Sequence, residues 1–155
     1  MVQRGRGQLS DDRWHEIRPH LWMGGHITGW GERVRPAVVR AEFDLVLSLY
    51  RLEGHGPAPG VEHHVAEMPD GPLTQAQLDE AARFAVLAAE AVRAGRSTLV
   101  RCHVGYNRSG LVVAQALVEL GMDVSEAIAL VREKRSPRAL HNEVFVRYLE
   151  RGMVL

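Results

Sequence analysis

Short apolar runs alternate along the chain with longer segments in which apolar residues recur at helical spacing. The short runs are bounded by Gly, Pro or polar clusters, which predicts strands at 17–25 (one or two strands), 43–50, 61–68 and 97–102. The longer segments predict helices at about 75–94, 109–120, 123–134 and 142–151. Strands and helices that alternate favour an α/β fold with a sheet covered on both faces.

Local signals mark where the helices begin and where the chain turns. Thr74 and Gln77 have the spacing of a capping box at the start of the first helix. Asp123 or Ser125 can cap a later helix. Gly and Pro predict a loop after the second strand region and a turn just before Thr74.

Length and charge narrow the class of protein. The chain has 155 residues, which is typical of one domain. Residues 1–12 are polar and Gly-rich, so we expect a flexible N-terminal segment there and a folded domain over 13–155. The formal net charge is zero, so no global field favours nucleic acid or an anionic membrane. No apolar run is long enough for a transmembrane helix, and the first residues lack the apolar core of a secretory signal.

Cys102 is the only cysteine. A single thiol excludes an intramolecular disulfide and a thiolate-rich zinc site. We therefore expect a reduced, cytoplasmic protein.

The surroundings of Cys102 indicate an anion site. The order is a strand, Cys102, a five-residue loop containing Gly105, then Arg108 and a helix. A loop that opens a helix presents backbone N–H groups and the positive end of the helix dipole. Arg108 can add a bidentate fork for a phosphate, and the same field favours a thiolate at Cys102. A buried structural cysteine is the alternative interpretation.

The stretch "CHVGYNRS" (102–109) resembles the signature C-x5-R-[ST] of the cysteine-dependent protein phosphatases, and its length and flanks are most similar to the dual-specificity branch. "RPHLWMGG", "MPDGP" and "RSPRALHNEVFVRYL" resemble the opening strand, the general-acid loop and the closing segment of that family. The resemblance implies a dual-specificity phosphatase-like catalytic domain. Its fold would be a central five-stranded, mostly parallel sheet flanked by helices, with no metal or other cofactor.

The resemblance also implies residue roles. Cys102 would be the nucleophile, Arg108 would bind the phosphoryl oxygens, and Ser109 would assist the departure of the sulfur. Asp70 would be the general acid, and Glu67 and Asp79 are the alternatives. Backbone N–H groups would complete the phosphate cradle, and they belong to His103, Val104, Gly105, Tyr106, Asn107 and Arg108.

One position departs from the family pattern. The residue before the nucleophile is usually His, which is thought to orient the loop, and here it is Arg101. Arg101 keeps a hydrogen-bond donor but changes the geometry, or else points into solvent.

Three other groups have a chemical and a structural interpretation. Four histidines suggest a metal, although their spacings fit no compact site: His55, His63, His64 and His103. Three tryptophans suggest a stacking platform, with core anchoring as the alternative: Trp14, Trp22 and Trp30. Three arginines suggest acidic substrates, with a solvated helix end as the alternative: Arg132, Arg135 and Arg138.

The sequence therefore predicts a phosphatase that hydrolyses phosphomonoesters through a phosphocysteine, with a phosphorylated protein as partner and no nucleic acid or membrane. Phosphotyrosine is the leading substrate, with phosphoserine and phosphothreonine as further candidates. RNA 5′-phosphates and phosphoinositides remain alternatives; the loop "HVGYN" contains no Lys or Arg for extra inositol phosphates. A phosphate-sensing or phosphoprotein-binding module with little turnover and a sulfurtransferase are the alternatives from other classes.

Overall fold

A five-stranded sheet forms the centre of the molecule. The computed structural model describes residues 13–155, so the segment 1–12 and its expected flexibility lie outside the described residues. The sheet contains β1 (Trp14–Arg18), β2 (Leu21–Gly25), β7 (Thr98–Cys102), β5 (Leu45–Ser48) and β6 (Glu62–Val65), in that spatial order. Only β1 is antiparallel to its neighbour, which confirms the predicted mostly parallel sheet.

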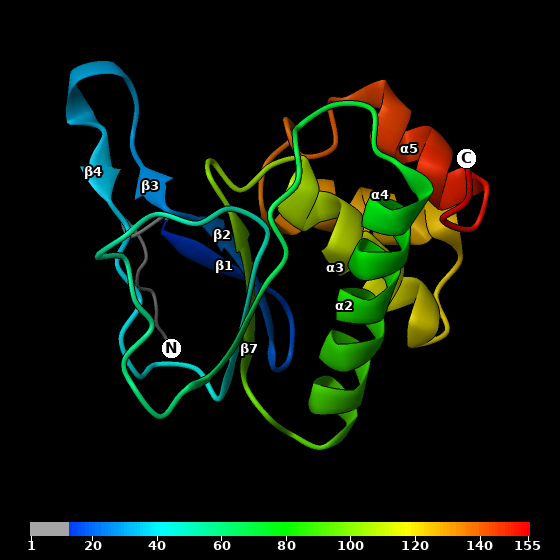
Figure 1. Ribbon diagram of the computed structural model, residues 1–155. Coiled ribbons are helices and arrows are strands. Elements are labelled where there is room, and N and C mark those ends of the chain that lie inside the picture. Colours follow the sequence, from blue (N-terminus) through cyan, green and yellow to red (C-terminus); the bar gives the residue numbers. More distant parts are fainter. Residues whose placement is uncertain (1–12) are drawn as a thin grey trace.

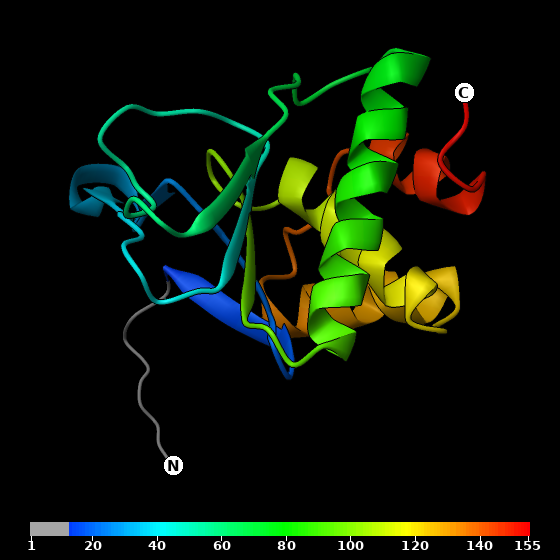
Figure 2. The same ribbon diagram turned by 60° about the horizontal axis from the view of Figure 1, so that its bottom comes forward.

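The four helices of the described region lie on one face of the sheet (Figures 1 and 2). They are α2 (Gln75–Arg93), α3 (Arg108–Glu119), α4 (Val124–Lys134) and α5 (Glu143–Glu150). The sheet is covered on both faces, as expected, and the long connections after β2 and β5, which form no α-helix, cover the face opposite the helices. These connections contain only β3 (Ile27–Thr28), the 3-10 turn η1 (Gly31–Arg33) and β4 (Arg35–Pro36).

Loop residues cover the other face of the sheet. Val39 and Phe43 pack there against Val46 of β5 and Leu99 of β7. The rings of Trp14 and Trp22 meet Phe43 edge-on, at centroid distances of 5.3 and 5.8 Å. Core anchoring is therefore confirmed for these two tryptophans, whereas Trp30 is 60% exposed.

Strand alternation gives β7 a different chemistry on each face. Val100 and Cys102 join the core beneath the helices, whereas Leu99 joins the loop-covered face. Arg101 therefore points away from the helices, and its side chain is only 1% exposed. Its guanidinium donates to Ser48 Oγ (2.9 Å) and to the carbonyls of His55 (2.8 Å) and Gly56 (2.7 Å). The interpretation that Arg101 points into solvent is wrong, because the 51–60 loop folds over it.

The predicted helix starts are present. Thr74 Oγ1 accepts from the N–H of Gln77, and Gln77 Oε1 accepts from the N–H of Thr74, so the capping box of α2 is confirmed. Asp123 rather than Ser125 caps α4, since it forms a second capping box with Glu126.

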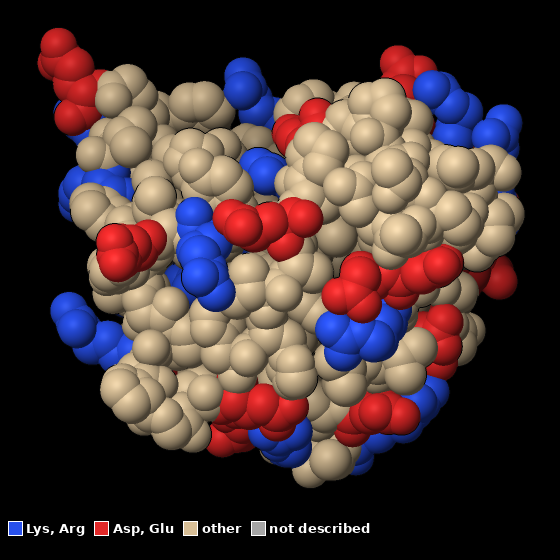
Figure 3. All heavy atoms as spheres, in the orientation of Figure 1, with Lys and Arg blue, Asp and Glu red and all other residues tan. Residues whose placement is uncertain are grey.

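The surface has no single-sign area on the face seen in Figure 3. Lys and Arg side chains are interspersed there with Asp and Glu. None of the helices formed by residues 13–155 is long and apolar enough to cross a membrane.

Two glycines of the 51–60 loop allow a matched test of how this loop is held. Both have positive φ, +84° at Gly54 and +75° at Gly56. A Cβ at Gly54 would meet open space, whereas a Cβ at Gly56 would fall on the carbonyl oxygen of Val39. Gly54→Ala should cost about 1–2 kcal/mol from backbone strain alone, and Gly56→Ala at least about 1 kcal/mol more. Urea denaturation measures both, and equal losses would show that the 51–60 loop is not packed against Val39.

Candidate active site

The candidate site lies where β7 ends and α3 begins. Strand β7 lies between β2 and β5, and its last residue is Cys102. Residues 103–107 form the connecting loop, and Arg108 is the first residue of α3. This crevice at the carboxyl ends of parallel strands is a common binding position in α/β folds.

A backbone N–H from the neighbouring chain segment holds the first part of the loop. The N–H of His26, which follows β2, donates to the carbonyls of Cys102 (3.0 Å) and His103 (2.8 Å). Two carbonyls are thereby turned toward the protein and away from the interior of the loop.

Arg135 and Leu140 hold the second part of the loop. Arg135 donates from Nη2 to the carbonyl of Val104 and from Nε to the carbonyl of Gly105, both at 3.0 Å. The N–H of Leu140 donates to the carbonyl of Tyr106 at 3.0 Å. Arg135 is therefore a structural tie for the loop, a role that the sequence did not reveal.

Three N–H groups of the loop have no acceptor among the described residues and can serve a ligand. Within residues 13–155, no acceptor is found for the N–H groups of Val104, Tyr106 and Asn107. Gly105 makes this curvature possible with φ +89°, and a Cβ there would come within 2.5 Å of the Gly24 carbonyl carbon. Backbone donors at a helix N-terminus form an anion site.

The sulfur of Cys102 lies at the floor of this cradle. Cys102 is 2% exposed, and its Sγ accepts from the N–H of Gly105 at 3.2 Å. The Oγ of the fully buried Ser109 lies 3.3 Å from the sulfur. When the thiol is ionised, that hydroxyl can donate to it, and the dipole of α3 adds a favourable field.

The side chain of Arg108 has a buried donor without a partner in the described part of the chain. Its Nη1 donates to the carbonyl of Met68 at 3.1 Å, which orients the guanidinium. Its buried Nε has no hydrogen-bond partner. Since a buried unsatisfied donor is costly, this N–H fits an oxygen of a bound anion.

Asp70 lines the same pocket, which has a volume of about 270 Å³. Two amides fix its carboxylate: Asn107 Nδ2 donates to Oδ2 (3.1 Å) and Asn142 Nδ2 donates to Oδ1 (3.2 Å). The N–H of Asn142 in turn donates to Asn107 Oδ1 at 3.0 Å. The two asparagines therefore tie the Asp70 loop to the cradle and to the start of α5.

Sequence reasoning missed the role of Asn142. The sequence indicated Asn142 only as the beginning of the last helix, and the structure confirms that its Oδ1 caps α5 by accepting from the N–H of Val144. The contact with Asp70 spans 72 residues of sequence, so no local pattern announces it. His141 also lines the pocket and lies 3.3 Å from the Asn107 amide nitrogen.

Some of the other predicted site residues line the pocket and some do not. Val104, Gly105, Tyr106, Asn107 and Arg108 line the pocket. His103 does not, and its ring lies against that of Tyr50 at 4.8 Å. Neither alternative acid lines the pocket: Asp79 lies on α2 bonded to Gln75, and Glu67 is exposed.

The four histidines considered as metal ligands do not form a cluster. Among residues 13–155 no three His, Cys, Asp or Glu side chains come together. His63 and His64 point to opposite faces of the sheet, toward Ser48 and Phe84.

Each of the three arginines has a contact inside the protein. Arg132 donates to the carbonyls of Ala139 and Leu140, and Arg135 holds the loop as described. Only Arg138 lines the pocket, with its guanidinium 4.7 Å from the ring of Trp30.

Comparisons with known proteins identify similar folds. No protein-family model matches the sequence, and no curated protein matches it significantly. Human DUSP28 matches with a TM-score of 0.71 at 23% identity, over 90% of this chain and 91% of its own. A mouse putative dual specificity phosphatase complexed with zinc tungstate matches with a TM-score of 0.73 at 25% identity, over 95% of this chain and 90% of its own.

A third solved structure matches over a similar length. The human tyrosine phosphatase-like serine/threonine/tyrosine-interacting protein has a TM-score of 0.62 at 20% identity, over 90% of this chain and 94% of its own. The matches confirm the expected fold over most of the chain.

The buried side chain of His26 predicts a pH dependence of stability. His26 is fully buried, its Nε2 donates to the carbonyl of Tyr50 (2.7 Å), and its Nδ1 has no partner. Burial, followed by the charge of Arg101, lowers the pKa of His26 from 6.5 to about 4. Folding then favours the neutral ring, so its contribution is complete above pH 6.5 and is lost as the pH falls toward 4.

The test compares the free energy of unfolding at pH 7 and pH 4. The amide side chain of the variant His26→Gln can still donate to Tyr50 but does not titrate. The decrease in its free energy of unfolding from pH 7 to pH 4 should therefore be smaller than that of wild type by about 3 kcal/mol. His20→Asn, at an exposed turn position with positive φ, is the control and should follow wild type. Identical pH profiles for His26→Gln and wild type would contradict the assignment of a neutral, buried His26.

Proposed function

We propose that this chain, which has the fold of the dual-specificity phosphatases, hydrolyses phosphomonoesters through a phosphocysteine intermediate. The observation that carries the proposal is the sulfur of Cys102 at the floor of a cradle of unused donors. Those donors are the loop N–H groups and the unpartnered Nε of Arg108. A phosphoryl group that satisfies them presents its phosphorus to the thiolate.

In the first step the Cys102 thiolate attacks phosphorus, so that a P–S bond forms and the bond to the leaving oxygen breaks. Arg108 and the loop N–H groups hold the equatorial oxygens, where charge develops. Asp70, on the pocket wall, gives its proton to the departing oxygen.

In the second step water attacks the phosphocysteine. Asp70, now ionised, takes a proton from that water, and the P–S bond breaks to release inorganic phosphate. The hydroxyl of Ser109, 3.3 Å from the sulfur, donates to the thiolate as it leaves. The cycle returns Cys102 and Asp70 to their starting states.

The walls of the pocket favour a phosphotyrosine residue of a protein as the substrate, with phosphoserine and phosphothreonine as further substrates. Trp30 and Val104 line the pocket and are 60% and 42% exposed, so an aryl group has apolar surface to contact. The face in Figure 3 shows no continuous basic area for RNA. A nucleophilic thiol also suits a reducing compartment, and we place the protein in the cytoplasm.

A binding module with little turnover is the second candidate. It is supported by the match to a phosphatase-like interacting protein and by Arg101, where the family usually has His. Release of phenol from an aryl phosphate separates the two functions, since a binder would hold vanadate without turnover. A panel of phosphopeptides, phosphoinositides and RNA 5′-phosphates then ranks the substrates.

Cys102→Ser tests the nucleophile. The variant should lose turnover of para-nitrophenyl phosphate by at least about 10³-fold, because an alcohol at this position is a far weaker nucleophile. Vanadate binding should stay within tenfold, since the cradle donors remain. Turnover by the variant within tenfold of wild type would exclude a phosphocysteine on this residue.

Asp70→Asn tests the general acid through the leaving group. On phenyl phosphate kcat/KM should fall by about 10²–10⁴-fold, because phenolate departs poorly without a proton. On 2,4-dinitrophenyl phosphate the loss should be much smaller, since that phenolate leaves unprotonated. Asp79→Asn on α2 is the matched control and should change neither rate. Equal losses of Asp70→Asn on both esters would make Asp70 a structural turn residue.

The amide clamp on Asp70 can be tested by the same pair of esters. Asn142→Ser keeps an N-cap oxygen for α5 but loses the amide that donates to Asp70. Its decrease in kcat/KM should be larger on phenyl phosphate than on 2,4-dinitrophenyl phosphate, as for Asp70→Asn, but smaller in magnitude. A loss on both esters alike would mean that Asn142 supports the fold and not the acid.

A further inference from the structure

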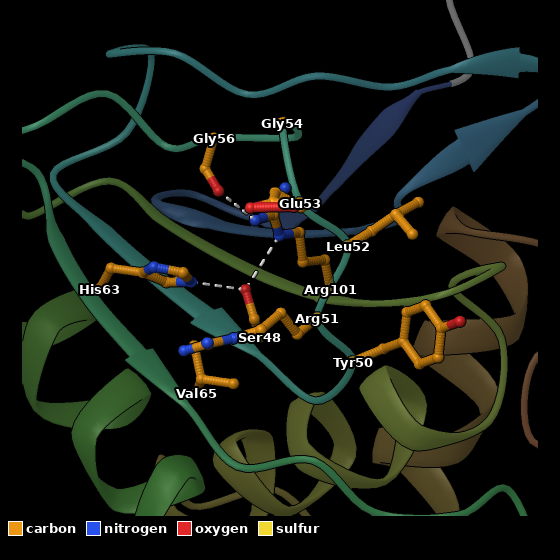
Figure 4. A pocket seen from close by; sticks show the side chains of 10 residues that line it. All are labelled: Ser48, Tyr50, Arg51, Leu52, Glu53, Gly54, Gly56, His63, Val65 and Arg101. Atoms are coloured by element: carbon orange, nitrogen blue, oxygen red, sulfur yellow. Dashed lines mark hydrogen bonds between the residues drawn. The ribbon is translucent and has the colours of Figure 1, made fainter.

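A second cavity lies on the face of the sheet opposite the Cys102 sulfur. Its volume is about 400 Å³, which is within the range of small-molecule sites. Figure 4 shows its lining side chains, which come from β5, the loop after it, β6 and β7. The charged and polar groups are Ser48, Arg51, Glu53, His63 and Arg101.

Arg101 brings an uncompensated charge to this cavity. It is 1% exposed, and no Asp or Glu of the described residues lies within ion-pair distance of it. Burial lowers its pKa to about 10, so the guanidinium is still charged at neutral pH. Buried charges are normally paired, because an isolated one is costly.

The guanidinium of Arg101 also has N–H groups that are not used in hydrogen bonds with the described residues. Arginine carries five N–H groups, and Arg101 uses Nε, Nη1 and Nη2 once each, toward Ser48, His55 and Gly56. One N–H on each terminal nitrogen is therefore without an acceptor in residues 13–155. These neutral acceptors orient the group without balancing its charge.

The other lining residues add positive potential and donors. Arg51 is a second cation, exposed at the cavity. Ser48 Oγ accepts from Arg101 Nε and lies 2.8 Å from His63 Nε2, as the dashed lines in Figure 4 show. Burial, Arg101 and Arg51 together lower the pKa of His63 to about 4, in agreement with a positive potential.

We propose that this cavity is a second anion site, which binds the phosphate group of a small organic phosphate between Arg101 and Arg51. The cavity has two guanidinium groups and only one carboxylate, that of Glu53, so its charge favours a dianionic phosphate ligand over a monoanionic carboxylate ligand. Leu52 and Val65 line the same cavity and give the organic part an apolar contact. The site is separate from the catalytic cradle, because it shares no lining residue with the Cys102 pocket.

The experiment is an NMR titration of the full chain with phenylphosphonate, which has no hydrolysable ester bond. The amides of Gly54 and Gly56 report on the second site, and the amide of Gly105 reports on the cradle in the same titration. We expect two binding curves with different dissociation constants. Benzoate should bind the Gly54 and Gly56 site at least about fivefold more weakly.

Two exposed residues of the cavity give variants with opposite expected effects. Arg51→Gln should weaken binding at Gly54 and Gly56 by about three- to tenfold, and Glu53→Gln should strengthen it by a similar factor. Arg83→Gln, on the helix-covered side, removes an equal charge and should change neither curve. The Gly105 curve should be unaffected by all three, which keeps this test independent of the proposed catalytic function.

Several results would overturn the second site. One is that the Gly54 and Gly56 amide signals do not shift at a phenylphosphonate concentration that saturates the Gly105 signal. Another is that their binding curve coincides with that of Gly105 and is unchanged by Arg51→Gln. Equal affinity for benzoate would overturn the assignment to phosphate. Arg101→Gln is not needed for any of these outcomes, so a folding defect in that variant cannot obscure them.

Discussion

The candidate site depends on hydrogen bonds that pull the carbonyls of one loop outward. A peptide unit that turns its carbonyl toward the protein turns its N–H the other way, so each tie also aims a donor at the interior of the loop. The donors of these ties come from two separate segments, one at His26 and the other at Arg135 and Leu140. The proposed anion site is therefore preorganised by the tertiary structure and would require no rearrangement when charge develops on a bound phosphoryl group.

Because side chains alternate between the two faces of a strand, the adjacent residues Arg101 and Cys102 have different roles. Cys102 faces the helices, where the start of α3 and the hydroxyl of Ser109 reach its sulfur. Arg101 faces the loops and holds the 51–60 loop against β5 and β7. Helices on only one face of the sheet make this division possible, because the loop-covered face supplies carbonyl oxygens that a packed helix would have used internally.

The sequence was informative wherever the signal is local. The strand–loop–helix order around Cys102, the capping box at Thr74 and the Asp70 turn all lie within a few residues, and the structure places Cys102 and Asp70 in one pocket. Asn142, Arg135 and His26 could not be found in this way, because each acts on a segment at least 30 residues distant. The sequence also predicts that both faces of the sheet are covered, but strand periodicity does not say whether a helix or a loop buries the outer apolar positions.

Arg101 shows how a change at one position can be absorbed without disturbing its neighbour. A buried guanidinium needs more acceptors than an imidazole, and the carbonyls of His55 and Gly56 provide two of them. Gly56 can present its carbonyl there because it has no side chain, which allows its positive φ and its close approach to Val39. The positive charge remains unbalanced, and it lowers the pKa of His26, whose own N–H holds the Cys102 carbonyl. A charged Arg101 therefore favours a neutral His26, and the guanidinium that holds the 51–60 loop also carries the charge on which the proposed second anion site depends.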